Sequence, residues 1–170
     1  PYNISGAAAD LVLTYSGLAS APVSLTVAPT SPGVYTTDAS GRGQGAILNY
    51  NLATNDYTLN SNAAPALKGG IAVLYVSGIG ATNASVAAPT TAAATLIAQN
   101  AVVTPSAMVS VTVGGIAASV IGAISPMGSV PGLLQINISI PSNAPVGAAV
   151  PVVVNVGGID TQSGVTMAIK

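Results

Sequence analysis

Few residues of this sequence carry side chains suited to acid–base, nucleophilic or metal chemistry. The chain of 170 residues contains no histidine, cysteine or glutamate. Its charged residues are Arg42, Lys68, Lys170, Asp10, Asp38, Asp56 and Asp160. The usual general bases, thiol nucleophiles and transition-metal ligands are therefore almost entirely missing. We predict that the protein is not an enzyme and that it holds no cofactor and no metal.

One short motif, Gly41-Arg42-Gly43-Gln44-Gly45, superficially resembles a phosphate-binding loop. It lacks the Lys-Ser/Thr pair of a P-loop, and no helical pattern follows it. A turn between strands is the better interpretation. The net charge is -1 with only 3 cationic residues, so no basic patch exists to neutralise phosphates and we expect no nucleic acid partner.

Three asparagine triplets have the N-glycosylation pattern, at Asn3, Asn83 and Asn137. Asn83 is the best candidate because it lies in an expected loop, whereas Asn137 lies in the middle of an expected strand. A glycan is therefore a candidate modification. The six tyrosines are interpreted mainly as core and interface aromatics, with Tyr35, Tyr50 and Tyr57 as stacking platforms if the protein were a carbohydrate-binding module.

The elements that must position these side chains are expected to be strands. Apolar residues alternate with small polar ones with period two, which places successive side chains on opposite faces of a half-buried strand. The runs are 11–15, 23–27, 109–113, 134–140, 152–156 and 165–169. Glycine and proline separate them at short spacing, which is typical of an all-β antiparallel sandwich. No clean apolar stretch of about 18 residues exists, so we expect no transmembrane helix.

Three polar or small-residue stretches lie between these runs. Residues 36–45 and the Asn-rich residues 49–62 are expected to be loops that flank a short strand around 46–49. The Ala/Thr-rich residues 84–98 are compatible with a long loop, an edge strand or one short helix.

An internal repeat links the two ends of the chain. The segment from Ala9 to Val27 resembles the segment from Val150 to Ile169, and each has the pattern of a closing hairpin. The second copy follows a segment long enough to form a domain, about residues 32–142, whereas only residues 1–8 precede the first copy. An isolated hairpin is marginal in water. We therefore expect its apolar residues to need a partner sheet, and the candidate subunit contacts are Leu11, Leu13, Tyr15, Val23, Leu25 and Val27.

Two parts of the sequence carry a resemblance to a known domain. The first is 27–36 with 43–49, and the second is 111–118, 131–141 and 151–158. These motifs resemble a β-rich, largely uncharacterised C-terminal domain of predicted secreted and surface proteins of acidobacteria. The resemblance implies an immunoglobulin-like sandwich of the transcription-factor and plexin (IPT/TIG) type without catalytic activity or cofactor. It divides the chain into an orphan N-terminal hairpin segment, 1–30, left from a preceding Ig-like module, and an Ig-like β-sandwich domain, 31–170.

These observations favour a structural role. The leading hypothesis is a subunit of an extracellular, pilus-like or sheath-like bacterial filament, which polymerises with copies of itself when the N-terminal segment adds strands to the next subunit. The alternatives are a C-terminal Ig-like spacer or adhesion module of a larger surface protein, and a carbohydrate-binding module. The resemblance, the glycosylation triplets and the low charge together predict an extracellular or cell-surface location, and the start at Pro1 suggests that an export signal was removed.

Overall fold

The computed structural model describes residues 6–83, 102–130 and 132–170. Within these ranges the chain forms strands and loops and no helix, which confirms the all-β prediction. The expectation for residues 84–98 lies outside the described residues. The strands are β1 (Ala8–Leu11), β2 (Thr14–Tyr15), β3 (Leu18–Ala19), β4 (Val23–Thr26), β5 (Gly33–Val34), β6 (Gly43–Gln44), β7 (Leu48–Asn51), β8 (Asp56–Leu59), β9 (Ile71–Ser77), β10 (Val109–Val113), β11 (Ile116–Ile124), β12 (Leu134–Ser139), β13 (Gly147–Val156), β14 (Ile159–Asp160) and β15 (Val165–Ile169).

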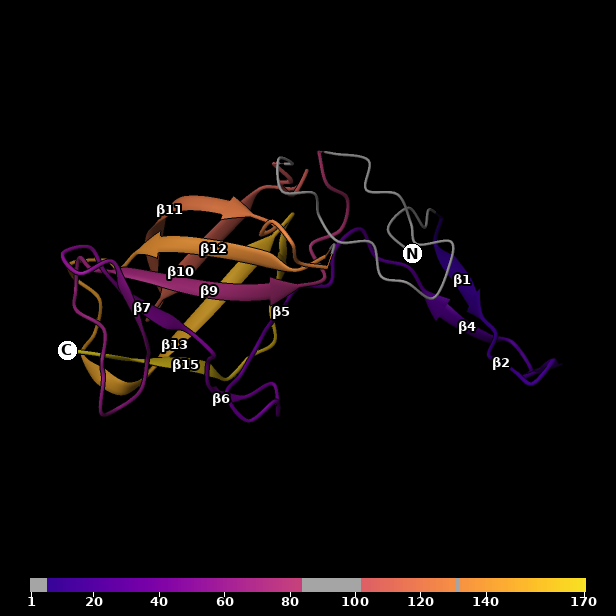
Figure 1. Cartoon of the computed structure of the whole chain (residues 1–170), viewed down its shortest axis with the longest axis horizontal. Helices are drawn as coiled ribbons and strands as arrows, with labels where there is room; N and C mark the ends of the chain where they lie inside the picture. Colours follow the sequence, from indigo (N-terminus) through magenta and orange to yellow (C-terminus); the bar gives the residue numbers. More distant parts are fainter. Residues whose placement is uncertain (1–5, 84–101, 131) are drawn as a thin grey trace.

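The body of the protein is built from one eleven-stranded sheet that folds over into two layers. Its main path runs β6-β15-β13-β10-β11-β12-β9-β7-β8, with β14 beside β13 and β5 beside β9. Strands β9 and β12 lie on one side of the body and β13 and β15 on the other (Figure 1). Strand β11 joins the layers, and its pairing with β12 shifts register between Val120 and Gly122, a β-bulge of the kind that lets a strand bend between layers.

The core lies between the two layers and consists of the inward residues of the period-two runs. Leu74 and Ile136 from one layer and Val154 and Met167 from the other are completely buried. The alternation seen in the sequence therefore puts the apolar half of each strand inside, as expected for a sandwich. An immunoglobulin-like topology stays a prediction. Among the described residues, no helix has the length and apolar character needed to cross a membrane.

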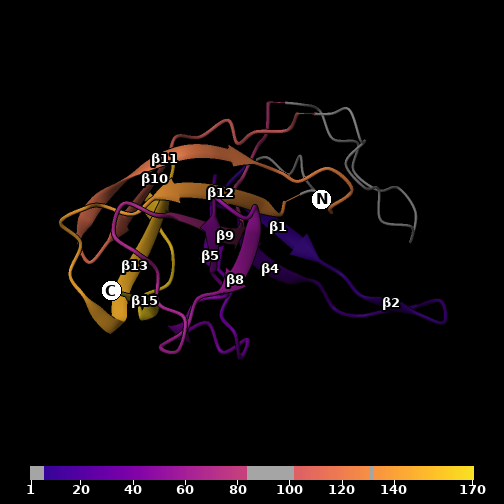
Figure 2. The same ribbon diagram turned by 60° about the vertical axis from the view of Figure 1, so that its left-hand side comes forward.

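The N-terminal hairpin stands apart from this body. Strands β1 and β4 pair only with each other, and β2 pairs with β3 toward the tip. Figure 1 shows the hairpin projecting from one end of the molecule, and Figure 2 shows the same projection after rotation. None of its residues belongs to the core cluster, which begins at Val34.

The Asn-rich stretch, expected to be a loop, is instead a second hairpin at the other end of the sheet. Strand β7 pairs with β9 on one side and with β8 on the other. The expectation was wrong because Leu48, Tyr50, Tyr57 and Leu59 keep a period-two spacing within the polar residues, and the asparagines mostly serve the turn and side-chain hydrogen bonds. Residues 36–45 form a turn as expected, although β6 within them pairs in parallel with β15.

The root of the N-terminal hairpin is clamped to the body. Beyond β4, the Thr30 hydroxyl donates a buried hydrogen bond to the carbonyl of Val156 (2.8 Å). The Ser31 amide donates to the carbonyl of Gly78 (2.8 Å). Only Val27, Ala28 and Pro29 therefore separate β4 from a fixed point, which leaves the hairpin little freedom to fold back.

Alanine in place of Gly78 is expected to break this clamp. Gly78 has a φ of 73°, and an added Cβ would lie 1.9 Å from the carbonyl oxygen of Ser31. Left-handed backbone costs an L-residue about 1–2 kcal/mol, and the backbone clash adds to it, so we expect a loss of about 3 kcal/mol or more in the free energy of unfolding, measured by denaturant titration.

Gly115→Ala provides the matched control. Gly115 has a similar φ of 79°, but nothing lies within 4 Å of its added Cβ, so only the conformational strain remains. Equal losses for the two variants would contradict the clamp.

Candidate functional site

The candidate site begins with the apolar surface of the N-terminal hairpin. Leu11 lies opposite Val23, and Ala9 lies opposite Leu25, so these side chains share one face. The exposed fractions of Leu11, Leu13, Tyr15, Val23 and Leu25 range from 48% to 80%. Val27 is half-buried near the root. The structure thus gathers the six residues that the sequence singled out on one projecting element, β1–β4.

The C-terminal copy of the repeated hairpin packs against the core of the body. Strand β13 pairs with β15, and its end pairs with β14 around Gly157-Gly158. The turn residues Gly157 and Gly158 have positive φ, as do Ser16 and Gly17 at the other tip, which suits a two-residue hairpin turn. The residues that align with the exposed five are no more than 1% exposed: Val152, Val154, Val156, Val165 and Met167.

At the far end of the body, strand β8 closes the sheet with an unpaired edge. It pairs with β7 alone. The Asn60 amide donates to the Ile47 carbonyl (2.8 Å), and hydrogen-bonded pairs alternate along an antiparallel ladder. The backbone groups of Thr58 therefore point toward β7, whereas those of Tyr57 and Leu59 point outward.

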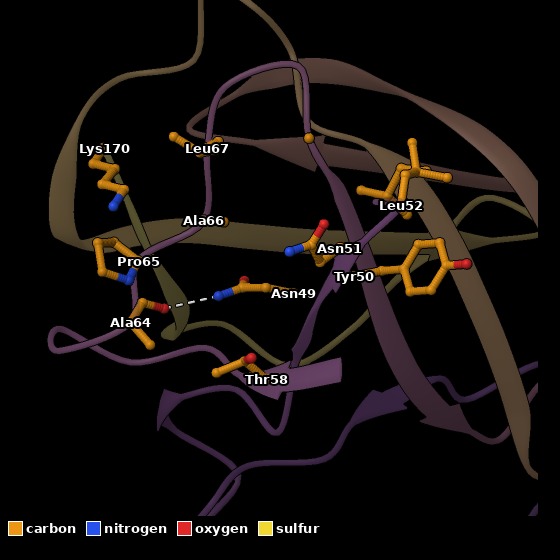
Figure 3. A pocket seen from close by; sticks show the side chains of 12 residues that line it. Asn49, Tyr50, Asn51, Leu52, Thr58, Ala64, Pro65, Ala66, Leu67 and Lys170 are labelled. Carbon is orange, nitrogen blue, oxygen red and sulfur yellow. Dashed lines mark hydrogen bonds between the residues drawn. The ribbon is translucent and has the colours of Figure 1, made fainter. Parts of the chain in front are cut away.

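Beside this edge lies an open groove of about 470 Å³. Its wall is formed by polar side chains of β7 and β8, including Asn49, Asn51 and Thr58, and by the segment 64–67. The Asn49 amide donates to the carbonyl of Ala64 (2.8 Å). Figure 3 shows Lys170 at the border of the groove and the ring of Tyr50 directed away from it. The groove therefore combines amide groups with one cation.

Two tyrosines occupy the opposite face of the same hairpin. Tyr50 and Tyr57 are cross-strand neighbours, with ring centroids 4.9 Å apart and an interplanar angle of 35°. The phenol of Tyr50 donates to the side-chain oxygen of Asn55 (2.5 Å). Tyr57 and Leu59 remain about half exposed, at 57% and 49%. Tyr35, the third candidate aromatic, is also exposed but lies near β5 instead.

Asn60, completely buried, joins the β7–β8 hairpin to β15. Its amide nitrogen donates to the Ala168 carbonyl (2.9 Å), and its oxygen accepts from the Ala168 amide (2.7 Å). The same side chain donates to Asn49 (2.9 Å) and accepts from Gln44 (3.1 Å). One side chain thus replaces a strand–strand pairing, and sequence reasoning missed it because its main partner lies far away in the chain.

Ionisable groups are sparse in the described parts of the chain. Hydrogen bonds from the amide and the hydroxyl of Ser40 hold the pKa of Asp38 below its ordinary value. No group of three or more His, Cys, Asp or Glu residues occurs within residues 6–83, 102–130 and 132–170.

The glycosylation candidates differ in their surroundings. Asn83 is exposed, and its side-chain oxygen accepts from the Thr104 amide (2.8 Å). Asn137 lies half-buried inside β12, where its oxygen accepts from Gln135 (3.0 Å). Asn3 lies outside the described residues. Of the two that are described, Asn83 is the more accessible.

Comparison of this chain with protein-family models, with curated proteins and with solved structures finds no match.

Proposed function

We propose that this protein is a structural subunit that polymerises head-to-tail, with the N-terminal hairpin of one copy adding to the sheet of the next by strand addition. One observation carries the proposal: five apolar residues are exposed on the N-terminal hairpin, whereas their counterparts in the C-terminal hairpin are buried. The same sequence pattern therefore packs against the core at the C-terminal end of the chain and is left uncovered in the N-terminal hairpin.

The energetic argument favours a covered hairpin. Burial of a large apolar side chain contributes about 1.5–3 kcal/mol, and Leu11, Val23 and Leu25 share one face that offers this gain. A two-stranded hairpin alone is at best marginally stable, and its unpaired edges are prone to pair with another chain. Association therefore both stabilises the hairpin and removes its edges from solvent.

The placement of the two ends favours an open polymer. The root of the hairpin contacts Gly78, just after the last residue of β9. The groove lies at the opposite end of β9, where Gly70 and Ile71 line it. In Figure 1 the hairpin and the C-terminus lie at opposite ends of the molecule. A contact between opposite ends is heterologous and repeats without closing unless the rotation happens to form a ring. The expected product is a filament.

The charge of the chain suits dense packing. With a net charge of -1, successive copies repel one another little. The proposed location is extracellular or at the cell surface, and this part of the proposal is supported by the sequence resemblance and by the glycosylation triplets.

The test is the state of the purified full chain. We expect filaments by electron microscopy and an average mass that rises with concentration in analytical ultracentrifugation. A chain that remains monomeric at high concentration would overturn the proposal. It would favour instead a spacer or adhesion module whose hairpin is covered by another part of a larger surface protein.

A carbohydrate-binding module is the second candidate. The half-exposed ring of Tyr57 packs against Tyr50 on the face of the β7–β8 hairpin opposite the groove, and such a ring offers a platform on which a sugar can stack. Binding on a glycan array that Tyr57→Ala abolishes and Tyr35→Ala preserves would support this candidate.

A further inference from the structure

We infer that the acceptor in the assembly is the outer edge of β8, and that β1 of the next copy pairs with it in parallel. This inference rests on the proposed function and names the partner surface that it requires. The order of strands across the contact would be β4-β1-β8-β7, so that the two strands of the donor hairpin extend the eleven-stranded sheet of the acceptor.

Strand β8 is the best acceptor edge of the described body. The main path of the sheet ends at β8 and at β6. Strand β6 has two residues and contains Gly43 with a φ of 74°, so it offers little regular edge. Strand β8 has four exposed residues, and the backbone groups of Tyr57 and Leu59 point away from β7. These groups are free to pair with an added strand.

The outer edge of β1 presents a matching set of groups. The Val27 amide donates to the carbonyl of Ala7 (3.0 Å), which makes 9–25 and 11–23 hydrogen-bonded pairs in the observed register. The backbone groups of Ala8 and Asp10 therefore point away from β4, toward the free side of β1.

The apolar faces decide the direction of pairing. In an antiparallel pair, residues with facing backbone groups lie opposite each other, so Asp10 would share a face with Tyr57 and Leu59. In a parallel pair, a residue whose backbone N–H and C=O face the neighbouring strand lies beside a residue whose backbone groups point away from it. Asp10 would then lie beside Thr58. Leu11 then lies on the face of Tyr57 and Leu59, and a single apolar surface continues across both hairpins. Only the parallel arrangement joins the two exposed apolar faces.

The directions of the strands agree with a repeat along the long axis. Strand β8 is antiparallel to β7, which is antiparallel to β9, so β8 and β9 run in the same sense. Figure 1 shows β9 running toward the end that bears the hairpin, and β1 running outward in the same general direction. Successive copies along this axis thus bring β1 and β8 together in parallel.

The charges are compatible with this arrangement. Asp10 is the only charged residue between Gly6 and Pro29. Parallel pairing places it on the face of Thr58, which carries the groove with Lys170 and also the carboxylate of Asp56, so one cation and one like charge lie on that face. In contrast, an antiparallel pair would place the Asp10 carboxylate on the apolar face of Tyr57 and Leu59.

The first test removes the outward donor of β8. Leu59→Pro deletes an amide that does not bond to β7, and proline is tolerated on an edge strand. We expect Leu59→Pro to end filament growth while Leu59→Val, which keeps the amide, assembles normally. Mixing Leu59→Pro with a chain carrying Leu11→Ser, Val23→Ser and Leu25→Ser should give 1:1 heterodimers, because each variant retains the half that the other lacks.

The second test uses the absence of cysteine from the chain. Leu11→Cys in one copy should form a disulfide with Leu59→Cys or Tyr57→Cys in another, and Thr58→Cys, on the opposite face, should not. Filaments of Leu59→Pro, or equal cross-linking of Thr58→Cys, would overturn the acceptor assignment and leave the proposed polymer intact. A monomeric parent chain that also gives no cross-link would instead overturn the polymer and its acceptor together.

Discussion

Serine at Leu11, Val23 and Leu25 together is expected to leave the protein folded and to abolish its assembly. The three side chains share the apolar face of the N-terminal hairpin and take no part in the core. If each contributes at least about 1.5 kcal/mol on burial, their loss weakens the association constant by about 10³-fold or more. Sedimentation measures the association, and thermal unfolding monitored by circular dichroism measures the body.

Val12→Ser is the control for this experiment. Val12 is also exposed and apolar. Because neighbouring side chains of an extended strand point to opposite faces, we expect Val12 to lie on the face opposite Leu11. It should therefore retain most of the association. If the triple variant assembled as strongly as the parent chain, the apolar face would not be the contact surface.

Asn60→Ala is expected to lower the free energy of unfolding by about 2–4 kcal/mol. The substitution leaves the buried amide of Ala168 without its partner, which costs about 1–3 kcal/mol. It also removes one of two bonds to the Ala168 carbonyl, which still accepts from the Ala66 amide (2.9 Å). The side-chain bonds to Asn49 and Gln44 are lost as well. Denaturant titration measures the change, and Asn62→Ala, at an exposed position that follows the same hairpin, should cost much less.

Asn60→Asp separates the role of the side-chain oxygen of Asn60, which accepts hydrogen bonds, from that of its nitrogen, which donates them. The new carboxyl group keeps the acceptor for the Ala168 amide but turns an oxygen toward the Ala168 carbonyl and toward Asn49. Burial without a cation raises the pKa of such a carboxyl in the folded state above its unfolded value of about 4. The variant is then most stable below about pH 4 and loses stability as the pH rises through the folded pKa. A pH-independent difference from the parent chain would contradict this account.

The strands of the body and the repeated hairpin were predictable from local patterns. Leu134, Ile136 and Ile138 alternate with Gln135, Asn137 and Ser139, and this alternation alone identifies the buried face. The same local pattern marked Leu11 and Leu13, but whether such residues find a body depends on the rest of the fold. The sequence pattern alone therefore could not determine whether these residues are buried or exposed.

The β7–β8 end of the molecule was not predictable in this way. The high asparagine content of residues 49–62 favours turns and concealed the alternation of Tyr57 and Leu59. The buried position of Asn60 depends on Ala168, more than a hundred residues later, and no local signal marks such a partner. The lining of the groove likewise includes Lys170, which lies more than a hundred residues after β7 in the sequence.

The clamp at Thr30 and Ser31 has a consequence for the form of the polymer. Because the hairpin is fixed at its root, its angle to the body is decided by the three residues from Val27 to Pro29. In an assembly built through this hairpin, every copy would inherit the same angle from the one before. The helical pitch and stiffness of the fibre would then be encoded in this short connection, independently of the surfaces that hold neighbouring copies together.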